Sequence, residues 1–99
     1  MHLELTQSAA QDLCTISHYT LETWGEEQQD RYLEGIYRKF EEIIDAPARW
    51  RFRNDLFPQC QIAQYGRHII LFVCKGELLT VVRVLHDAMD FERHIPEDY

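Results

Sequence analysis

The sequence lacks the features that mark membrane spans, disulfide-rich secreted proteins and nucleotide-binding loops. Its longest uninterrupted apolar run covers only residues 69–74, far short of the ~20 residues that a membrane-spanning helix needs. The three cysteines are an odd number that cannot all pair within the chain, and the four glycines form no glycine-rich loop. The first residues lack the basic and apolar regions of a signal peptide. We therefore expect a cytoplasmic protein with reduced thiols, no membrane partner and no cofactor.

Basic residues are also scarce. Ten lysines and arginines stand against seventeen aspartates and glutamates, which gives a net charge of -7. Such a charge repels nucleic-acid phosphates unless a local basic patch compensates it. The imbalance is uneven, because residues 49–83 hold six basic residues against two acidic ones while both flanking segments are acidic. We therefore expect no direct sequence-specific binding of nucleic acid, and the middle of the chain is its cationic part.

The strongest strand patterns lie in the second half of the chain. Residues 78–86 are dense in valine and leucine, and they suit a strand because β-branched side chains fit the pleat. Residues 59–65 and 67–74 are two further strand patterns separated by Gly66, so we expect a three-stranded antiparallel meander. Strict alternation along 78–86 leaves neither face polar. The last strand is therefore expected to be covered on both sides.

The first half of the chain predicts one short strand and two helices. Residues 2–6 alternate polar and apolar side chains, as a half-buried strand does. A capping box beginning at Ser8 predicts an amphipathic helix that ends at Gly25. A longer helical pattern follows at once and ends before Pro47. The two helices are expected to fold back as a hairpin. Gly35 marks either a close approach to the first helix or an ordinary glycine that the second helix tolerates.

Together these elements predict an α+β fold in which residues 1–99 form one domain. A hydrophobic content of 45% is enough for a single core. We expect the helical hairpin to pack on one face of a small antiparallel sheet, formed by the meander and the N-terminal strand. Residues 48–56 show no clean period and are expected to be a connection with one helical turn. The tail is expected to pack back on the sheet as far as Ile95 and to be free from Pro96 onward.

The cysteines and one histidine give weak signals for chemistry. Cys14 and His18 are four residues apart on the first helix, but two ligands do not make a zinc site. We interpret them as a buried thiol and a surface imidazole, and we predict no metal site. Cys60 and Cys74 come close across the meander, where we favour two reduced core residues over a disulfide.

Two other groupings leave alternatives open. Residues 49–53 interleave three arginines with two aromatic residues, a pattern that suits single-stranded nucleic acid or an acidic peptide. We slightly favour a solvated loop with both aromatic side chains in the core. His86 and Asp90 lie four residues apart just after Arg83, and they suit either a phosphate-handling site or a structural hydrogen bond. We favour a hydrogen bond between His86 and Asp90.

Several local sequences resemble the ParE toxins of bacterial type II toxin–antitoxin modules, within the broader ParE/RelE group. The resemblance runs nearly end to end and includes Trp24-Gly25 after the first helix and Gly66 followed by His68-Ile69-Ile70. Its most specific part is Arg83-Val84-Leu85-His86 followed by Met89-Asp90-Phe91, because a strand ending in Arg-aliphatic-Leu-His and then Met-Asp is common in these toxins. The chain departs from the family pattern at Gln61 and Phe72, where an arginine and a tyrosine are usual.

The resemblance implies a toxin, involved in plasmid stabilisation or growth arrest, that poisons DNA gyrase without catalytic residues of its own. It also implies a ParD-like antitoxin whose C-terminal segment covers the open face of the sheet. We expect the antitoxin to contact apolar side chains of the last two strands, namely Ile69, Leu71, Val82 and Val84. We expect the target to contact the start of the tail, namely Met89, Asp90, Phe91 and Arg93.

Two other hypotheses are kept. A RelE-type, ribosome-dependent ribonuclease would use Arg83 and His86, with His94 or Tyr99, around the scissile phosphate. The other is an inactive relative retained as an antitoxin-binding module. The acidic balance of the chain favours the gyrase hypothesis over the ribonuclease, which is expected to present a basic face to RNA.

Overall fold

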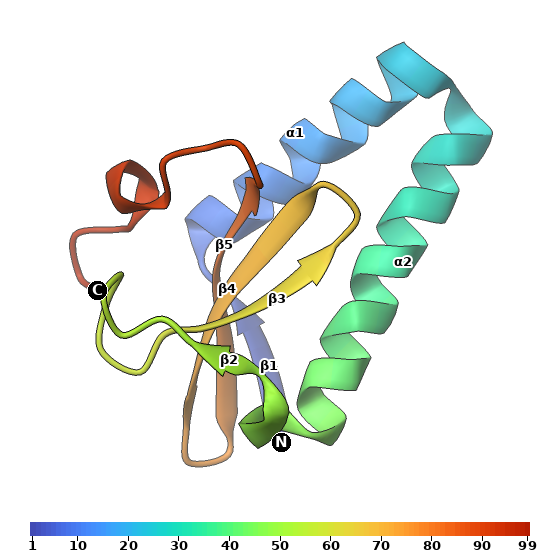
Figure 1. Cartoon of the computed structure of the whole chain (residues 1–99). Helices are drawn as coiled ribbons and strands as arrows, with labels where there is room; N and C mark the ends of the chain where they lie inside the picture. The colour runs from blue at the N-terminus through green and yellow to red at the C-terminus, as the bar shows by residue number, and fades with distance from the viewer.

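The computed structural model describes residues 1–99, and a helical hairpin covers one face of its five-stranded sheet (Figure 1). No helix is long and apolar enough to cross a membrane. In chain order the elements are β1 (His2–Leu5), α1 (Gln7–Trp24), α2 (Glu26–Asp45), the 3-10 helix η1 (Pro47–Arg49), β2 (Arg51–Phe52), β3 (Gln61–Tyr65), β4 (His68–Lys75), β5 (Leu78–His86) and the 3-10 helix η2 (Phe91–His94).

The sheet has the order β1-β5-β4-β3-β2 and is mixed rather than antiparallel. Strands β2 to β5 are antiparallel neighbours, as the predicted meander requires, but β1 runs parallel to β5, with Leu3 opposite Leu79. The hairpin and the other strands lie between β1 and β5 in sequence, and this long connection lets the two strands run in the same direction. The α+β fold is therefore confirmed, and the prediction that every strand is antiparallel was wrong.

Thr6, and not Ser8, caps the first helix. The Thr6 hydroxyl accepts a hydrogen bond from the Ala9 backbone N–H at 3.0 Å and donates one to the Val82 carbonyl at 2.7 Å. One side chain thus satisfies a free donor at the helix N-terminus and ties that end to β5. The hairpin turn at Gly25 has a φ of +91°, which a residue without Cβ adopts at little cost.

A β-bulge in β5 breaks the alternation that the sequence predicted. Phe72 on β4 pairs with Val81, and the adjacent Leu71 pairs with Arg83. Val82, which lies between Val81 and Arg83, therefore has no partner in the ladder. A bulge of this kind shifts the alternation by one residue. Val84 therefore lies on the helix-covered face together with Val81, whereas strict alternation had placed it with Val82.

The sheet has a hydrophobic core on each face. The helix-side core contains twelve buried residues: Ala9, Leu13, Ile16, Ile36, Phe40, Ile43, Ala63, Ile70, Phe72, Leu79, Val81 and Val84. The tail-side core contains seven: Phe57, Cys60, Ile69, Leu71, Val73, Val82 and Leu85. The last strand is thus covered on both faces, as predicted, and the second cover is supplied by the chain itself.

The tail and the loop before β3 form that second cover. Phe91 and Ile95 from the tail, with Leu56 from the loop, pack against the tail-side core, and Figure 1 shows the tail on the side of the sheet away from α2. The end of the tail is also held, because the ring of Tyr99 meets Phe57 edge to face at 5.4 Å between centroids. The prediction that the last residues are free was therefore wrong.

Two other local predictions are corrected. The connection after α2 contains the predicted helical turn and also strand β2, in which Phe52 is 52% exposed. Of the two aromatic residues in this connection, Trp50 packs on the helix-side core and Phe52 does not. A Cβ at Gly35 would overlap the hydroxyl group of Tyr65, so this glycine permits a close approach to β3 and not to the first helix.

Candidate partner-binding groove and its supporting ion pair

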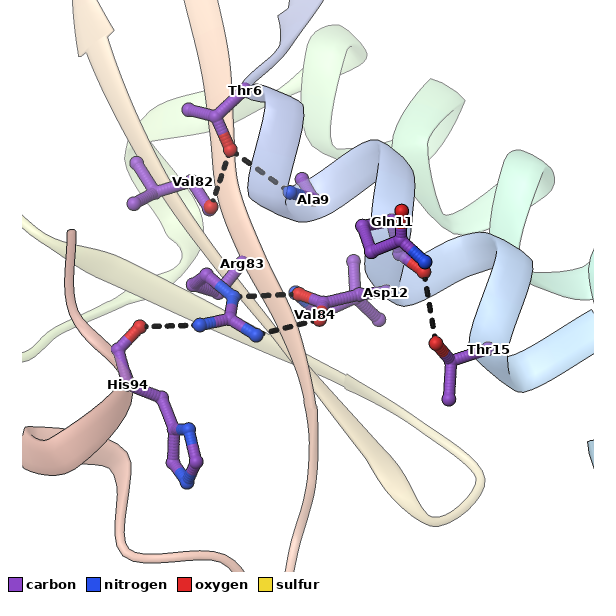
Figure 2. A network of polar contacts seen from close by, with 9 residues as sticks. All are labelled: Thr6, Ala9, Gln11, Asp12, Thr15, Val82, Arg83, Val84 and His94. Atoms are coloured by element: carbon purple, nitrogen blue, oxygen red, sulfur yellow. Dashed lines mark hydrogen bonds and ion pairs between the residues drawn. The ribbon is translucent and has the colours of Figure 1, made fainter.

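An ion pair between α1 and β5 holds the first helix on the sheet (Figure 2). The Arg83 guanidinium donates to both carboxylate oxygens of Asp12, at 2.7 and 2.6 Å, and to the His94 carbonyl at 2.7 Å. Asp12 also accepts the Val84 backbone N–H at 3.0 Å. Its side chain is 13% exposed and that of Arg83 is 18% exposed. The hydrogen bond to Asp12 raises the pKa of Arg83 further above its usual range.

This geometry gives Arg83 a structural role, and it argues against the hypothetical role of Arg83 as a phosphate clamp. A guanidinium recognises a phosphate through a two-point fork, and both points of that fork are bonded to Asp12. The sequence alone gives no sign that Asp12 is the partner of Arg83, because 71 residues separate them. Its polar position on an amphipathic helix looked like an ordinary surface position.

The other residues of the hypothetical ribonuclease site do not converge on Arg83. His86 is exposed and its Nδ1 lies 3.1 Å from the Ala88 backbone nitrogen. His94 contacts Arg83 through its backbone carbonyl and not through its imidazole, as Figure 2 shows. Tyr99 packs against the loop before β3. The structure therefore assembles no set of phosphate-binding and acid–base groups from these four residues.

The predicted hydrogen bond between His86 and Asp90 does not form. His86 Nδ1 lies 3.3 Å from a carboxylate oxygen of the neighbouring Asp87. Asp90 instead pairs with Arg93, at 3.4 Å, one turn further along the tail. The carboxylate of Asp90 is therefore engaged within the tail and not at the end of β5.

No metal site is formed by the cysteines and histidines. No group of three or more histidine, cysteine, aspartate or glutamate side chains is placed to hold a metal ion. Cys14 is exposed and not buried as predicted, and all three cysteines are free thiols. Cys60 is a buried core residue, and burial raises the pKa of its thiol to about 12. A thiol with that pKa is unreactive near neutral pH.

A groove of about 350 Å³ lies between α1 and the adjoining ends of β4 and β5. Its apolar lining residues are Ile16, Tyr19, Val84, Leu85 and Met89. Tyr19 is 64% exposed and Met89 is 45% exposed, so both sides of the groove present apolar surface to solvent. An apolar hollow with exposed aromatic and methionine side chains is typical of a surface that binds another protein.

One end of the groove contains a half-buried histidine, His68, held by a residue of α2. His68 Nδ1 lies 2.6 Å from the Tyr32 hydroxyl, which also accepts the Arg67 backbone N–H at 3.2 Å. The His68 and His86 rings meet edge to face, with their centroids 5.6 Å apart. Burial, and next the proximity of His86, lower the pKa of His68. The folded protein therefore favours a neutral His68, whose Nδ1 shares a hydrogen bond with the Tyr32 hydroxyl.

We expect the stability of this protein to fall as the pH falls below the ordinary histidine pKa of about 6.5. The unfolded chain binds a proton at His68 more readily than the folded chain does, so acid favours unfolding in this range. Urea unfolding at pH 7.5 and pH 5.5 will show a larger loss of stability in the wild type than in His68→Gln. His18→Gln, which removes an exposed histidine of α1, is the matched control. Equal pH dependence in the wild type and His68→Gln would contradict the prediction.

The four side chains predicted to contact an antitoxin do not share one surface. Ile69, Leu71 and Val82 are buried in the tail-side core, beneath the loop and the tail. Val84 lies on the opposite, helix-covered face because of the bulge, where it forms part of the groove. Any partner that contacts the first three residues must first displace the chain's own tail.

The four side chains predicted to contact the target also do not form one surface, because three are exposed and one is half-buried. Met89, Asp90 and Arg93 are exposed at the start of the tail, and Met89 lines the groove. Phe91 is half-buried and packs on the tail-side core. Three of these residues are therefore accessible, and the fourth stabilises the tail.

The helical hairpin, the mixed sheet and the polar pair that joins them define a small α+β protein with an apolar groove beside its first helix. A family model described as the ParE toxin of the type II toxin–antitoxin system parDE matches residues 3–91. The chain therefore belongs to the ParE toxin family. It is the toxin of a ParDE-type toxin–antitoxin system, and this family implies an antitoxin partner.

Relatives and solved structures agree with this assignment. The chain is 28% identical to Toxin ParE1 of Mycobacterium tuberculosis strain H37Rv over 92 residues, which cover 92% of this chain and 94% of the relative. It is also 28% identical to Toxin ParE1 of Caulobacter vibrioides over 91 residues, with the same two coverages. A chain of the chromosomal ParDE system from P. aeruginosa has the same fold, with a TM-score of 0.74 at 19% identity, covering 87% of this chain and 95% of that one.

Proposed function

We propose that this toxin arrests growth in the cytoplasm by binding DNA gyrase, and that a ParD-like antitoxin neutralises it. The Asp12–Arg83 pair is the observation that favours a protein target over RNA cleavage, because it occupies the guanidinium that a ribonuclease would use. The net charge of -7 supports the same choice, since it opposes binding to an RNA backbone.

The groove is the proposed site of antitoxin contact. Its exposed Tyr19 can be contacted without displacement of the tail, and the buried Val84 forms part of its apolar floor. The proposed target surface is formed by Met89, Asp90 and Arg93, and it begins at the same groove, because Met89 lines it. An antitoxin segment bound in the groove would cover Met89, and this overlap accounts for neutralisation.

A gyrase assay tests the proposed target. Purified toxin is incubated with DNA gyrase, ATP and relaxed plasmid, and supercoiling is followed on agarose gels. We expect the toxin to inhibit supercoiling and an equimolar ParD-like antitoxin to restore it. A parallel assay with ribosomes and messenger RNA is expected to show no cleavage. Ribosome-dependent cleavage would replace the gyrase hypothesis with the ribonuclease one, and inactivity in both assays would indicate an inactive relative.

Paired variants test the two surfaces separately. Tyr19→Asp places a charge in the groove and is expected to weaken antitoxin binding while gyrase inhibition persists. Replacing Met89 and Arg93 together by alanine is expected to weaken gyrase inhibition without unfolding the protein, because both side chains are exposed. Arg31→Ala, on the exposed face of α2, is the control for both. Antitoxin binding and gyrase inhibition are titrated for each variant, and circular dichroism checks that each variant is folded. The two titrations distinguish a loss of antitoxin binding from a loss of gyrase inhibition.

A further inference from the structure

Strand β2 leaves one edge of the sheet open. It is the last strand in the sheet order, and it pairs only with β3. The Arg53 N–H donates to the Cys60 carbonyl at 2.8 Å, and Arg51 lies opposite Ile62. Hydrogen-bonded pairs alternate along an antiparallel ladder, so the N–H and C=O of Phe52 point away from β3. This edge can therefore exchange two backbone hydrogen bonds with another strand.

The side chains around this edge give it a positive charge. Arg49 and Arg51 form no ion pair, whereas Arg53 is neutralised by Asp55 at 2.8 Å. The nearby N-terminal amino group pairs with Glu77 at 3.7 Å. The Arg49 guanidinium lies over the Trp50 ring, 4.6 Å from its centroid, so Arg51 is the arginine of this edge best placed to meet a partner's carboxylate. On a chain of net charge -7, this cationic segment favours an acidic partner.

An apolar hollow lies beside the same edge. It has a volume of about 320 Å³ and is lined by Phe52, Met1 and Pro47, among others. Phe52 and Met1 are both substantially exposed. Phe52 lies opposite Gln61, while its neighbour Arg51 lies opposite Ile62, so their side chains project to opposite faces of the sheet. An added strand would meet an apolar hollow on one face and a guanidinium on the other.

We propose that this edge binds an extended acidic segment of a partner protein, which adds to the sheet as a sixth strand next to β2. The open backbone groups supply affinity, the hollow takes an apolar side chain, and Arg51 pairs with a carboxylate on the opposite face. Single-stranded nucleic acid fits less well, because only one aromatic ring of the Arg49–Arg53 run is exposed for base stacking. This surface lies at the β2 edge and not at the groove beside β5, so the proposal does not depend on the gyrase target.

Fluorescence anisotropy of the full-length protein tests this proposal. The probe is a short labelled peptide of alternating glutamate and valine, which presents acids on one face and apolar side chains on the other. We expect saturable binding that weakens as salt is added. Arg51→Glu is expected to weaken it by about tenfold or more. Arg31→Glu makes the same charge change on the exposed face of α2 and is expected to leave binding within about twofold, since exposed surface charges contribute little.

A second probe tests strand addition itself. The same peptide, N-methylated at every second residue on one edge, keeps its charge but cannot exchange backbone hydrogen bonds on that edge. Its binding is expected to be lost. Equal binding of the methylated peptide would overturn the proposal, because the contact would then be electrostatic only. Failure of the unmodified peptide to bind would also overturn it, as would tighter, Arg51-dependent binding of a labelled oligothymidylate.

Discussion

A chain that ends at His86 is expected to lose much of its folding stability, in addition to any contact that its tail makes with a target. Truncation removes Phe91 and Ile95 from the tail-side core and removes the His94 carbonyl from Arg83. Complete burial of a phenylalanine or isoleucine is worth roughly 2–5 kcal/mol on truncation to alanine. For two partly buried residues we expect a combined loss of about 3–4 kcal/mol, a large share of the 5–15 kcal/mol that stabilises a typical domain.

Urea unfolding followed by circular dichroism measures this loss. Phe91→Ala alone is expected to cost about 2 kcal/mol, because its ring is half-buried. Deletion of residues 96–99 is the milder control, since it removes the contact between Tyr99 and Phe57 but leaves Phe91 and Ile95 in place. If the chain ending at His86 unfolds at the wild-type urea concentration, the tail does not stabilise the sheet and its only role is contact with other molecules.

Asp12→Ala is expected to destabilise the protein by about 3 kcal/mol, because it leaves a largely buried guanidinium without its counter-charge. The backbone N–H of Val84 loses its acceptor in the same variant. Arg83→Lys keeps the charge but not the two-point geometry, so we expect a smaller loss. The exposed pair of Arg31 with Glu27 is the matched control, and Arg31→Ala is expected to change stability by less than about 0.5 kcal/mol.

The double variant Asp12→Leu with Arg83→Met separates the cost of leaving one charge unpaired from the contribution of the ion pair itself. Replacing both charges with apolar side chains is expected to recover most of the stability, because neither charge is then left unpaired. Recovery in urea unfolding, compared with each single variant, would show that the pair is structural. Ribosome-dependent RNA cleavage that disappears in Arg83→Lys at unchanged stability would instead show that Arg83 acts in a catalytic site.

The structural pair also changes how a loss of toxicity should be interpreted. An Arg83 variant that no longer arrests growth is expected to have a lower folded population, so toxicity must be normalised to the amount of folded protein. The exposed residues Met89 and Arg93 allow a cleaner test of the target surface, because their replacement leaves both cores intact.

The sequence by itself determined the local elements of this protein. Helical periodicity with breaks at Gly25 and Pro47 predicted two helices with nearly the observed bounds. Strand periodicity and the turn at Gly66 predicted the meander, and the apolar character of residues 78–86 predicted cover on both faces. These signals are local, because each depends on side chains a few residues apart. The motif from Arg83 to Phe91 led to the correct family.

Only the tertiary structure decided which elements and side chains meet. A run of consecutive apolar residues gives no sign of the bulge at Val82, because Val81, Val82 and Val84 look alike in any register. The apolar residues of the tail indicated burial but not its location, so a partner was predicted where the chain covers its own sheet. Asp12 and Arg83 are distant in sequence and meet only because β1 and the hairpin bring α1 onto β5. Long-range pairing depends on the path of the whole chain, and the local patterns that define helices and strands do not contain it.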